Sequence, residues 1–218
     1  MKIVTEEFFI HKGEFSQSKE LNQILIEIRT AIKSVSWHVE DSFIINPIRK
    51  GNGVVPIKLN FIKTLVSFGW KAEKRMRLAE GMNPGPIDIV KATSYGDFAV
   101  EWETGNISSS HRALNKMAVG IIQDLIIGGI LILPSRNLAR YLTDRIGNFE
   151  EIKPYFSLYR NVIVDSGVLG AIAIDYDDFS DKSPLIPKGY DGRSRRRKDL
   201  NNPLLGTKLS DDLSSSEK

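Results

Sequence analysis

The stretch Phe98-Ala99-Val100-Glu101-Trp102-Glu103-Thr104-Gly105-Asn106 decides how this 218-residue chain folds. Alternate side chains of a strand share a face, so its apolar residues are expected to face a core while Glu101 and Glu103 point together the other way. Two residues of strand separate these carboxylates by roughly 6–7 Å. Thr104-Gly105-Asn106 then ends the strand, and a helical pattern follows at once. The stretch therefore predicts a strand that carries two acids and passes directly into a helix.

A β-hairpin is expected immediately before this junction. Residues 86–90 and 98–103 read as strands on either side of the turn residues Ser94-Tyr95-Gly96-Asp97. A hairpin closed symmetrically around 94–97 places Asp88 directly opposite Glu103. Three carboxylates on one patch repel one another unless a cation neutralises them, and a hard ion such as Mg²⁺ prefers oxygen ligands. The alternative is an ordinary solvated strand face, which two alternating glutamates alone would more often indicate.

Helical and strand patterns alternate along the rest of the chain. Apolar spacing predicts helices over 18–34 and from Pro56 to Gly69, then the hairpin, then a long helix with an apolar stripe from Ile107 to Leu125. A buried strand at 130–133, short helices that begin at Ser135 and Asn148, and a last strand at 168–174 follow. This order predicts an α/β fold with a mixed central sheet flanked by helices. We expect a single domain over 1–199 and a disordered polar tail over 200–218.

Composition limits the classes of function. The chain has no cysteine, which excludes disulfides, thiolate metal sites and cysteine nucleophiles and fits a reducing cytosol. No apolar run is long enough to cross a bilayer, and residues 1–7 lack the apolar stretch of a signal peptide, so a cytoplasmic protein without membrane contact is expected. The segment Lys188–Lys198 holds six basic residues and one acidic residue, a net +5, whereas the whole chain carries +3. This cluster indicates a polyanionic partner, the alternative being a solvated tail.

The start of the predicted long helix is rich in side chains that suit DNA. It holds Asn106, Ser108, His111 and Arg112 within its first turns. A helix N-terminus attracts phosphate, and Asn and Arg are side chains that read bases. Candidate metal ligands and candidate DNA readers therefore lie within a dozen residues of one another.

Taken together, these residues resemble the restriction endonucleases of the BamHI family. The resemblance implies the PD-(D/E)xK nuclease fold in its BamHI variant. It also implies a type II enzyme that cuts duplex DNA at the palindrome GGATCC and leaves 5′ overhangs. The stretches that carry the resemblance occur in the family's order and are residues 52–58, 85–88, 101–112, 141–150 and 184–192.

By motif position, the resemblance implies that Asp88, Glu101 and Glu103 are catalytic, with Glu103 in the place where the wider superfamily has Lys. Glu73 matches a further active-site acid, although a solvated glutamate at a helix end is the alternative. The implied cofactor is two Mg²⁺ ions on Asp88, Glu101 and Glu73, one activating the attacking water and the other stabilising the leaving 3′ oxygen. Glu103 is then placed to orient or deprotonate that water.

Base recognition follows from residue type at the matching positions. Arg112, Asp144 and Arg145 suit two G·C pairs, whereas Asn106 and Ser108 suit one A·T pair. Three pairs per subunit, doubled by a two-fold axis, give a six-base palindrome. Without the resemblance, Asp144 and Arg145 would be interpreted as a local salt bridge.

The resemblance also implies partners. Asp191-Gly192 matches a segment that reaches the minor groove, and Lys58 and Arg193 are expected to contact the minor groove or the DNA backbone. The helix around Ile107–Leu125 is expected to form a homodimer interface, simple core packing being the alternative. A DNA methyltransferase would protect the host genome. The rival functions are a non-catalytic DNA-binding protein and a structure-specific repair nuclease on the same scaffold.

Overall fold

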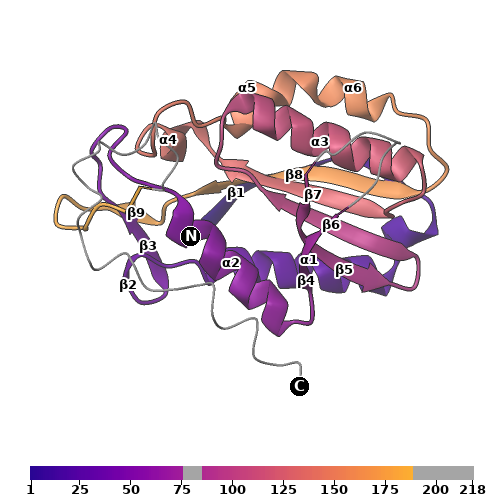
Figure 1. Cartoon of the computed structure of the whole chain (residues 1–218), viewed down its shortest axis with the longest axis horizontal. Coiled ribbons are helices and arrows are strands. Elements are labelled where there is room, and N and C mark those ends of the chain that lie inside the picture. Colours follow the sequence, from indigo (N-terminus) through magenta and orange to yellow (C-terminus); the bar gives the residue numbers. More distant parts are fainter. Residues whose placement is uncertain (76–84, 189–218) are drawn as a thin grey trace.

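The computed structural model describes residues 1–75 and 85–188, and these build one six-stranded sheet with helices on both faces (Figure 1). The three central strands β6, β7 and β8 run parallel, and antiparallel strands extend the sheet on both sides. The predicted mixed α/β sheet is confirmed. In spatial order the strands are β1 (Lys2–Lys12), β8 (Gly167–Asp175), β7 (Gly128–Pro134), β6 (Gly96–Trp102), β5 (Ile87–Thr93) and β4 (Lys71–Lys74).

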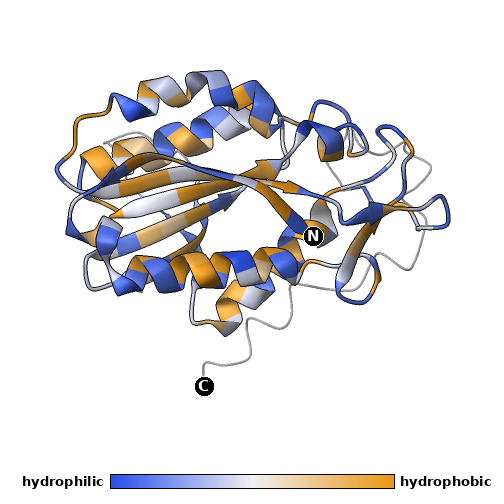
Figure 2. Ribbon diagram, turned by 180° about the vertical axis from the view of Figure 1, so that it is seen from behind, coloured by the Kyte–Doolittle hydropathy of each residue, from blue (hydrophilic) through white to orange (hydrophobic). Residues whose placement is uncertain are grey.

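The helices form two layers, each with its own core. Helices α1 (Lys19–Lys33) and α2 (Val55–Ser67) cover one face of the sheet (Figure 1). Helices α3 (Ile107–Ile122), α5 (Phe149–Ile152) and α6 (Phe156–Arg160) cover the other. The strands between them are largely apolar, whereas the helices alternate apolar and polar positions (Figure 2). Such near-continuous apolar strands are typical of a sheet that is buried on both faces.

Smaller elements complete the chain. The 3-10 helix η1 (Glu14–Gln17) follows β1, and η2 (Lys153–Tyr155) joins α5 to α6. Helix α4 (Arg136–Ala139) begins directly after β7. A small second sheet has the order β2 (His38–Val39), β3 (Ser42–Ile45) and β9 (Asp178–Phe179). Within the described ranges, every helix is too short or too polar to serve as a membrane span.

The predicted helix starts agree with the observed caps. The side chain of Ser18 accepts a hydrogen bond from a backbone N–H in the first turn of α1, and Ser135 and Asn148 do the same for α4 and α5. Each cap satisfies one of the backbone donors that a helix start leaves without a partner. Local sequence chemistry therefore fixes these boundaries.

The predicted hairpin register was wrong. Thr93 pairs with Gly96, so only Ser94 and Tyr95 form the loop, and Gly96 takes a φ of 126°, a conformation that favours glycine. Two-residue loops match the twist of paired strands, which favours the tighter turn. The pairing of Ile89 with Val100, continued by one residue, sets Asp88 opposite Glu101 rather than Glu103.

The sequence patterns also missed both edge strands of the six-stranded sheet and all three strands of the small second sheet. Strand β1 pairs antiparallel with β8 at one edge of the sheet, and β4 pairs antiparallel with β5 at the other. Glu73 lies on β4, so its interpretation as a helix-end residue was wrong. The predicted tail over 200–218, the residues Asp191, Gly192 and Arg193, and the basic cluster beyond Lys188 all lie outside the described residues.

Candidate active site

The site lies where β6 passes into α3. The backbone N–H of Glu103 still bonds to the carbonyl of Ile132 at 2.8 Å, so strand-like pairing continues one residue past β6. Asn106 then caps α3 by accepting a hydrogen bond from the N–H of Ser109 at 3.1 Å. Only Thr104 and Gly105 separate the last paired strand residue from the helix cap. The predicted strand-to-helix junction is therefore present.

Asp88 and Glu101 form an acidic pair at this junction. The backbone N–H of Asp88 donates to Oε2 of Glu101 at 3.4 Å, and the N–H of Trp102 donates to Oδ2 of Asp88 at 2.9 Å. Glu101 is only 7% exposed because α3 covers this face of the sheet. The alternative of a solvated strand face is therefore wrong, since one carboxylate of the pair is buried.

Two lysines from different helices hold the acidic pair. Lys58 of α2 lies with Nζ 2.6 Å from Oδ1 of Asp88. Lys116 of α3 forms an ion pair with Oε1 of Glu101 and donates to the carbonyl of Pro86 at 2.9 Å. Lys116 is 6% exposed, whereas Lys58 is half-buried. Lys58, predicted to contact DNA, forms an ion pair with Asp88 in this structure, and Lys116 was not predicted at all.

The lysines do not fully offset the environment of Glu101. Burial and the negative charge of Asp88 raise the pKa of Glu101 to about 7, against the opposing effect of Lys116. Within the described residues, Oε1 of Glu101 has no hydrogen-bond partner of good geometry, although Lys116 is in ion-pair contact with it. A buried carboxylate with a raised pKa and an unsatisfied oxygen favours the approach of a further cation.

Glu103 is held differently from the pair. Its Oε1 accepts a hydrogen bond from the N–H of Gly105 at 2.7 Å. Burial raises its pKa, and the Gly105 hydrogen bond and the charge of Lys58 oppose that rise. The negative charge of Asp88 raises the pKa of this carboxyl, whereas the positive charge of Arg112 lowers it. Glu103 therefore belongs to the same electrostatic cluster, and a raised pKa makes its carboxylate a better proton acceptor.

The donors at the site suit a hard cation. Asp88 and Glu101 offer only carboxylate oxygens, which Mg²⁺ prefers. Across residues 1–75 and 85–188, no three acidic or histidine side chains converge into a closed metal cage. Glu73 is exposed on β4 with a φ of 55°, and the β4–β5 register, in which Ala72 pairs with Ile89 and Lys74 with Ile87, sets its backbone opposite Asp88. The structure thus brings Asp88, Glu101 and Glu103 together and carries Glu73 on the neighbouring strand.

The predicted base readers lie on one surface beside the acids. Asn106, Ser108 and Arg112 are exposed on the first turns of α3, and Asp144 and Arg145 are exposed on the loop after α4. A hydrogen bond of 2.9 Å from the N–H of Gly147 to the carbonyl of Gly105 joins this loop to the junction. A Cβ at position 147 would lie 2.8 Å from Cα of Ile107, so the close approach requires glycine.

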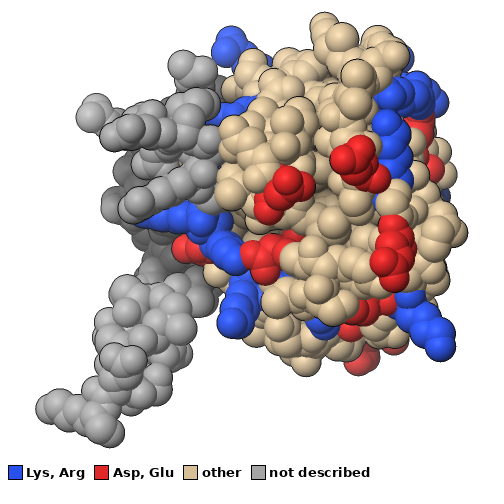
Figure 3. All heavy atoms as spheres, turned by 90° about the vertical axis from the view of Figure 1, so that its right-hand side faces the viewer, with Lys and Arg blue, Asp and Glu red and all other residues tan. Residues whose placement is uncertain are grey.

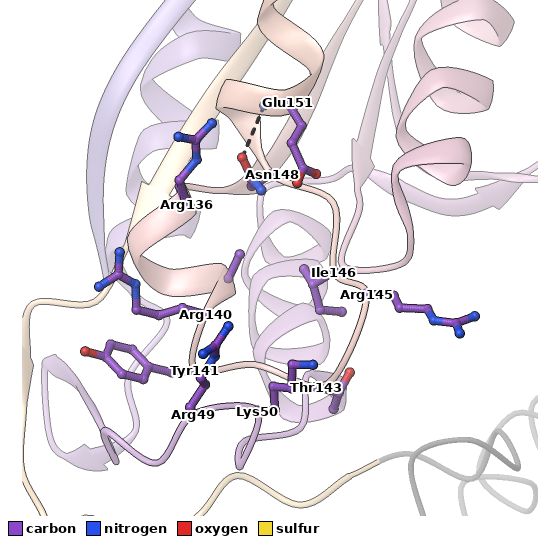
Figure 4. A pocket seen from close by; sticks show the side chains of 11 residues that line it. Arg49, Lys50, Arg136, Arg140, Tyr141, Thr143, Arg145, Ile146, Asn148 and Glu151 are labelled. Carbon is purple, nitrogen blue, oxygen red and sulfur yellow. Dashed lines mark hydrogen bonds between the residues drawn. The ribbon is translucent and has the colours of Figure 1, made fainter.

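Asp144 forms its ion pair with Lys50 and not with Arg145, the partner that a local salt bridge would use. Oδ1 of Asp144 lies 2.7 Å from Nζ of Lys50, and this ion pair lowers the pKa of the carboxyl. Arg145 contacts Asp144 through its backbone N–H at 3.1 Å. A local Asp144–Arg145 salt bridge is therefore absent from the described residues, and the guanidinium of Arg145 extends away from the loop (Figure 4).

Asn52 is a structural residue whose role was missed. It is fully buried, and its Nδ2 donates to the carbonyls of Asn46 and Tyr141 at 2.8 and 3.0 Å. Its Oδ1 accepts from the N–H of Ile186, and the N–H of Gly53 donates back to the carbonyl of Ile186 at 2.7 Å. Asn52 and Gly53 therefore join the chain near residues 46, 141 and 186. This junction lies at the base of the loop after α4 that carries Asp144 and Arg145, which is called the reader loop below.

Comparison with known proteins identifies the family. Residues 1–193 match the family model described as restriction endonuclease BamHI. The chain belongs to the BamHI family. It is 49% identical over 197 residues to the type II restriction enzyme OkrAI of Oceanobacter kriegii, covering 90% of this chain and all of that relative. It is 37% identical over 205 residues to the type II restriction enzyme BamHI of Bacillus amyloliquefaciens, covering 88% of this chain and 93% of that relative.

Solved structures support the same fold. The crystal structure of the restriction endonuclease BglII complexed with a DNA 16-mer superposes with a TM-score of 0.58 at 16% identity, over 81% of this chain and 79% of that one. Free BglII gives a TM-score of 0.50, also at 16% identity, over 81% of each chain. The chain is thus a BamHI-family type II restriction enzyme, a site-specific deoxyribonuclease, and the predicted family and enzyme class are confirmed.

Proposed function

We propose that this BamHI-family enzyme cuts duplex DNA at GGATCC, leaves 5′ overhangs and uses Mg²⁺. The observation that carries the proposal is the β6–α3 junction. There an acidic pair with one buried carboxylate, a third carboxylate and five exposed polar side chains of base-reading type lie on this short segment, the adjoining strand β5 and the loop bonded to the junction. The motif matches that suggest GGATCC are Asn106, Ser108, Arg112, Asp144 and Arg145.

The chemistry is hydrolysis of one phosphodiester bond per strand. Two Mg²⁺ ions, held by Asp88 and Glu101 with Glu73 as a further candidate ligand, would neutralise charge on the phosphate and lower the pKa of the attacking water. The water oxygen bonds to phosphorus as the bond to the 3′ oxygen breaks, leaving a 5′ phosphate and a 3′ oxyanion that takes a proton from solvent water to become the 3′ hydroxyl. Glu103 takes the proton of the water, a role that its raised pKa supports.

Base reading is assigned from residue type at the motif positions. Arg112, Asp144 and Arg145 would read two G·C pairs, and Asn106 and Ser108 one A·T pair. Lys50 bonds to Oδ1 of Asp144, and a carboxylate accepts several hydrogen bonds, so a cytosine amino group can bind beside Lys50 or displace it. An exposed ion pair of this kind stabilises by at most about 1 kcal/mol, so displacing Lys50 is inexpensive. Outside the described residues, Asp191, Gly192 and Arg193 remain candidates for minor-groove or backbone contacts.

A two-fold palindrome calls for a homodimer, and we place its interface on the outer helical layer. Much of the predicted stripe on α3 is core, because Leu114, Met117 and Ile121 are buried. The stripe leaves Ile122 and Leu125 exposed at 52% and 42%. Beside α3, Tyr155 packs edge-on against His111, and the neighbouring Leu158 of α6 is also exposed. This apolar face gives a second copy a surface to cover.

The cellular setting follows from the proposed cleavage. An enzyme that cuts a six-base palindrome would cut the genome of its own host, so a cognate DNA methyltransferase is the proposed functional partner. The cysteine-free composition fits the prokaryotic cytosol as the place where both act.

Incubating the full chain with plasmid DNA and Mg²⁺, followed by sequencing of the fragment ends, tests the proposal. Discrete fragments that begin within GGATCC support it. Tight binding without cleavage, or nicking at branches rather than at a sequence, would replace it with one of the rival functions.

Replacing Glu103 by Ala is expected to abolish cutting and leave DNA binding intact, as measured by plasmid digestion and gel mobility shift. Retained cutting would refute the role of Glu103. The matched control is Glu40→Ala, an exposed acid at the turn between β2 and β3 that lies outside the β6–α3 junction.

A further inference from the structure

A basic cavity lies at the same end of the sheet as the reader loop. Its volume is about 670 Å³, and it opens between α4, the loop that follows α4 and the segment around Arg49 (Figure 4). Five of its lining residues are cationic and one is acidic, Glu151. The cationic residues are Arg49, Lys50, Arg136, Arg140 and Arg145.

Most of these cations have no anionic partner. Among the residues that the structure describes, the guanidinium groups of Arg49, Arg136, Arg140 and Arg145 form no ion pair, and only Lys50 is paired, with Asp144. Elsewhere in the described residues, Arg29 pairs with Glu6 and Arg160 pairs with Glu7, whereas Arg75 and Arg112 form no ion pair. The guanidinium of Arg145 extends away from the loop (Figure 4), and the uncompensated positive charges that remain at the hollow repel one another, so the cavity favours an anion.

The backbone that carries two of these arginines is firmly anchored. Ser135, 2% exposed, caps α4 and donates to Oδ2 of the buried Asp175 at 2.9 Å. The N–H of Arg136 donates to Oε2 of Glu150 at 2.8 Å. Arg136 and Arg140 are four residues apart, a spacing that brings side chains about 5–6 Å from each other on one helical face. They are therefore held where two neighbouring anionic groups can be bound together.

The lining residues, size and position of the cavity indicate which kind of anion it binds. The guanidinium fork matches the paired oxygens of phosphate, and the hollow is larger than a single phosphate requires. Arg145 lines the cavity and also stands among the proposed base readers. At the opposite end of the sheet, where the β5–β6 turn lies, separate acidic side chains are scattered over a surface of mainly uncharged residues, with basic side chains toward its edge (Figure 3). An extended chain of phosphates at the reader end fits all three observations.

We propose that this cavity binds the phosphodiester backbone of the DNA duplex, with Arg136 and Arg140 contacting neighbouring phosphates of one strand. The inference rests on the proposed function, because it takes the DNA that is read at Asp144 and Arg145 as the occupant. These contacts carry no sequence information. They fix the position and register of the duplex, so that the reader side chains meet base edges and the acids meet a phosphate.

The test measures how DNA affinity depends on salt. The full chain, Arg136→Gln and Arg140→Gln are titrated without divalent metal onto a GGATCC duplex and onto a scrambled duplex, between about 50 and 200 mM KCl. Each lost phosphate contact should reduce the slope of log affinity against log salt by about one, and weaken binding to both duplexes by the same factor. Arg160→Gln is the matched control, because this arginine is exposed and already paired with Glu7. Its slope should equal that of the unaltered chain.

Charge-conserving variants and a folding check complete the test. Arg136→Lys and Arg140→Lys keep the charge and should restore most of the slope, and thermal melts check that every variant is folded. Unchanged slopes in folded Gln variants would overturn the proposal. A second result would also overturn it. Inorganic phosphate would raise the melting temperature of the unaltered chain but not that of the Gln variants, and the salt slopes of DNA binding would be the same for all of them. The cavity would then bind a free anion and not the DNA backbone. An unaltered chain that binds both duplexes equally would instead refute the GGATCC assignment, and the slopes would still test the cavity.

Discussion

Replacing Glu101 by Gln is expected to stabilise the metal-free protein at pH 8. Burial and the charge of Asp88 raise the pKa of Glu101 from 4.5 to about 7. The folded state therefore binds this proton more tightly than the unfolded chain, so the associated stability is fully present below about pH 4.5 and is lost as the pH rises through about 7. At about 1.4 kcal/mol per pH unit, ionised Glu101 destabilises the fold by about 3 kcal/mol.

Glutamine has the shape of the protonated acid and does not ionise, so Glu101→Gln should regain up to about 3 kcal/mol. In a domain of this size that corresponds to a melting temperature higher by about 6–12 °C. The gain should appear in EDTA at pH 8 and vanish near pH 4. Adding Mg²⁺ should stabilise the unaltered protein and narrow the difference, because the cation takes over neutralisation of the pair.

The assay is thermal and urea unfolding in EDTA across this pH range, with Glu27→Gln as the control. Glu27 is buried like Glu101, and burial raises its pKa, but hydrogen bonds from Lys91, Trp70 and Gln23 outweigh that effect and lower it. Glu27→Gln should therefore destabilise the protein at pH 8. The reasoning is refuted if Glu101→Gln is no more stable than the unaltered chain at pH 8, or if the two variants shift in the same direction.

Two other substitutions test the surroundings of the site. Lys116→Met removes one partner of a buried ion pair and should lower the free energy of unfolding by about 3–5 kcal/mol at pH 8. The loss should be smaller at pH 5, because Glu101 is protonated there. An equal loss at both pH values would contradict the pairing. Asn52→Ala leaves the carbonyl of Asn46 and the N–H of Ile186 without their buried partner and removes one of the two hydrogen bonds to the carbonyl of Tyr141. It should lower the same free energy by about 2–4 kcal/mol in urea unfolding. A loss below about 1 kcal/mol would show that Asn52 does not hold the segments together.

The elements set by local chemistry were predictable. Capping side chains and apolar spacing gave the starts of α1, α4 and α5, and the alternation in 98–103 gave β6. The hairpin register was not predictable in this way. A shift of two residues leaves every side chain on the same face, so the pattern of apolar and acidic residues fits both registers. Only the length of the turn decides whether Asp88 meets Glu101 or Glu103.

The remaining errors come from interactions between distant segments. Strand β1 lacks a clear alternation because its pairing with β8 shifts register between Ile3 and Thr5 and again between Phe8 and Ile10. Such irregularities remove the period of two on which a strand prediction depends. Lys116 gave no signal because its partner lies on another layer, 15 positions earlier in the chain. The acids of the site were therefore predictable, whereas the lysines that hold them were not.

The way Asn52 joins three segments has a consequence for engineering a new recognition sequence. One side chain fixes the relative positions of the chain near residues 46, 141 and 186, so an insertion or deletion in any one of them displaces the other two. Loop grafting or length variation at the base of the reader loop should therefore yield mostly misfolded proteins. Libraries confined to the exposed positions 106, 108, 112, 144 and 145 leave this framework intact. Diversity in specificity is accordingly to be sought by exchanging side chains at fixed backbone length.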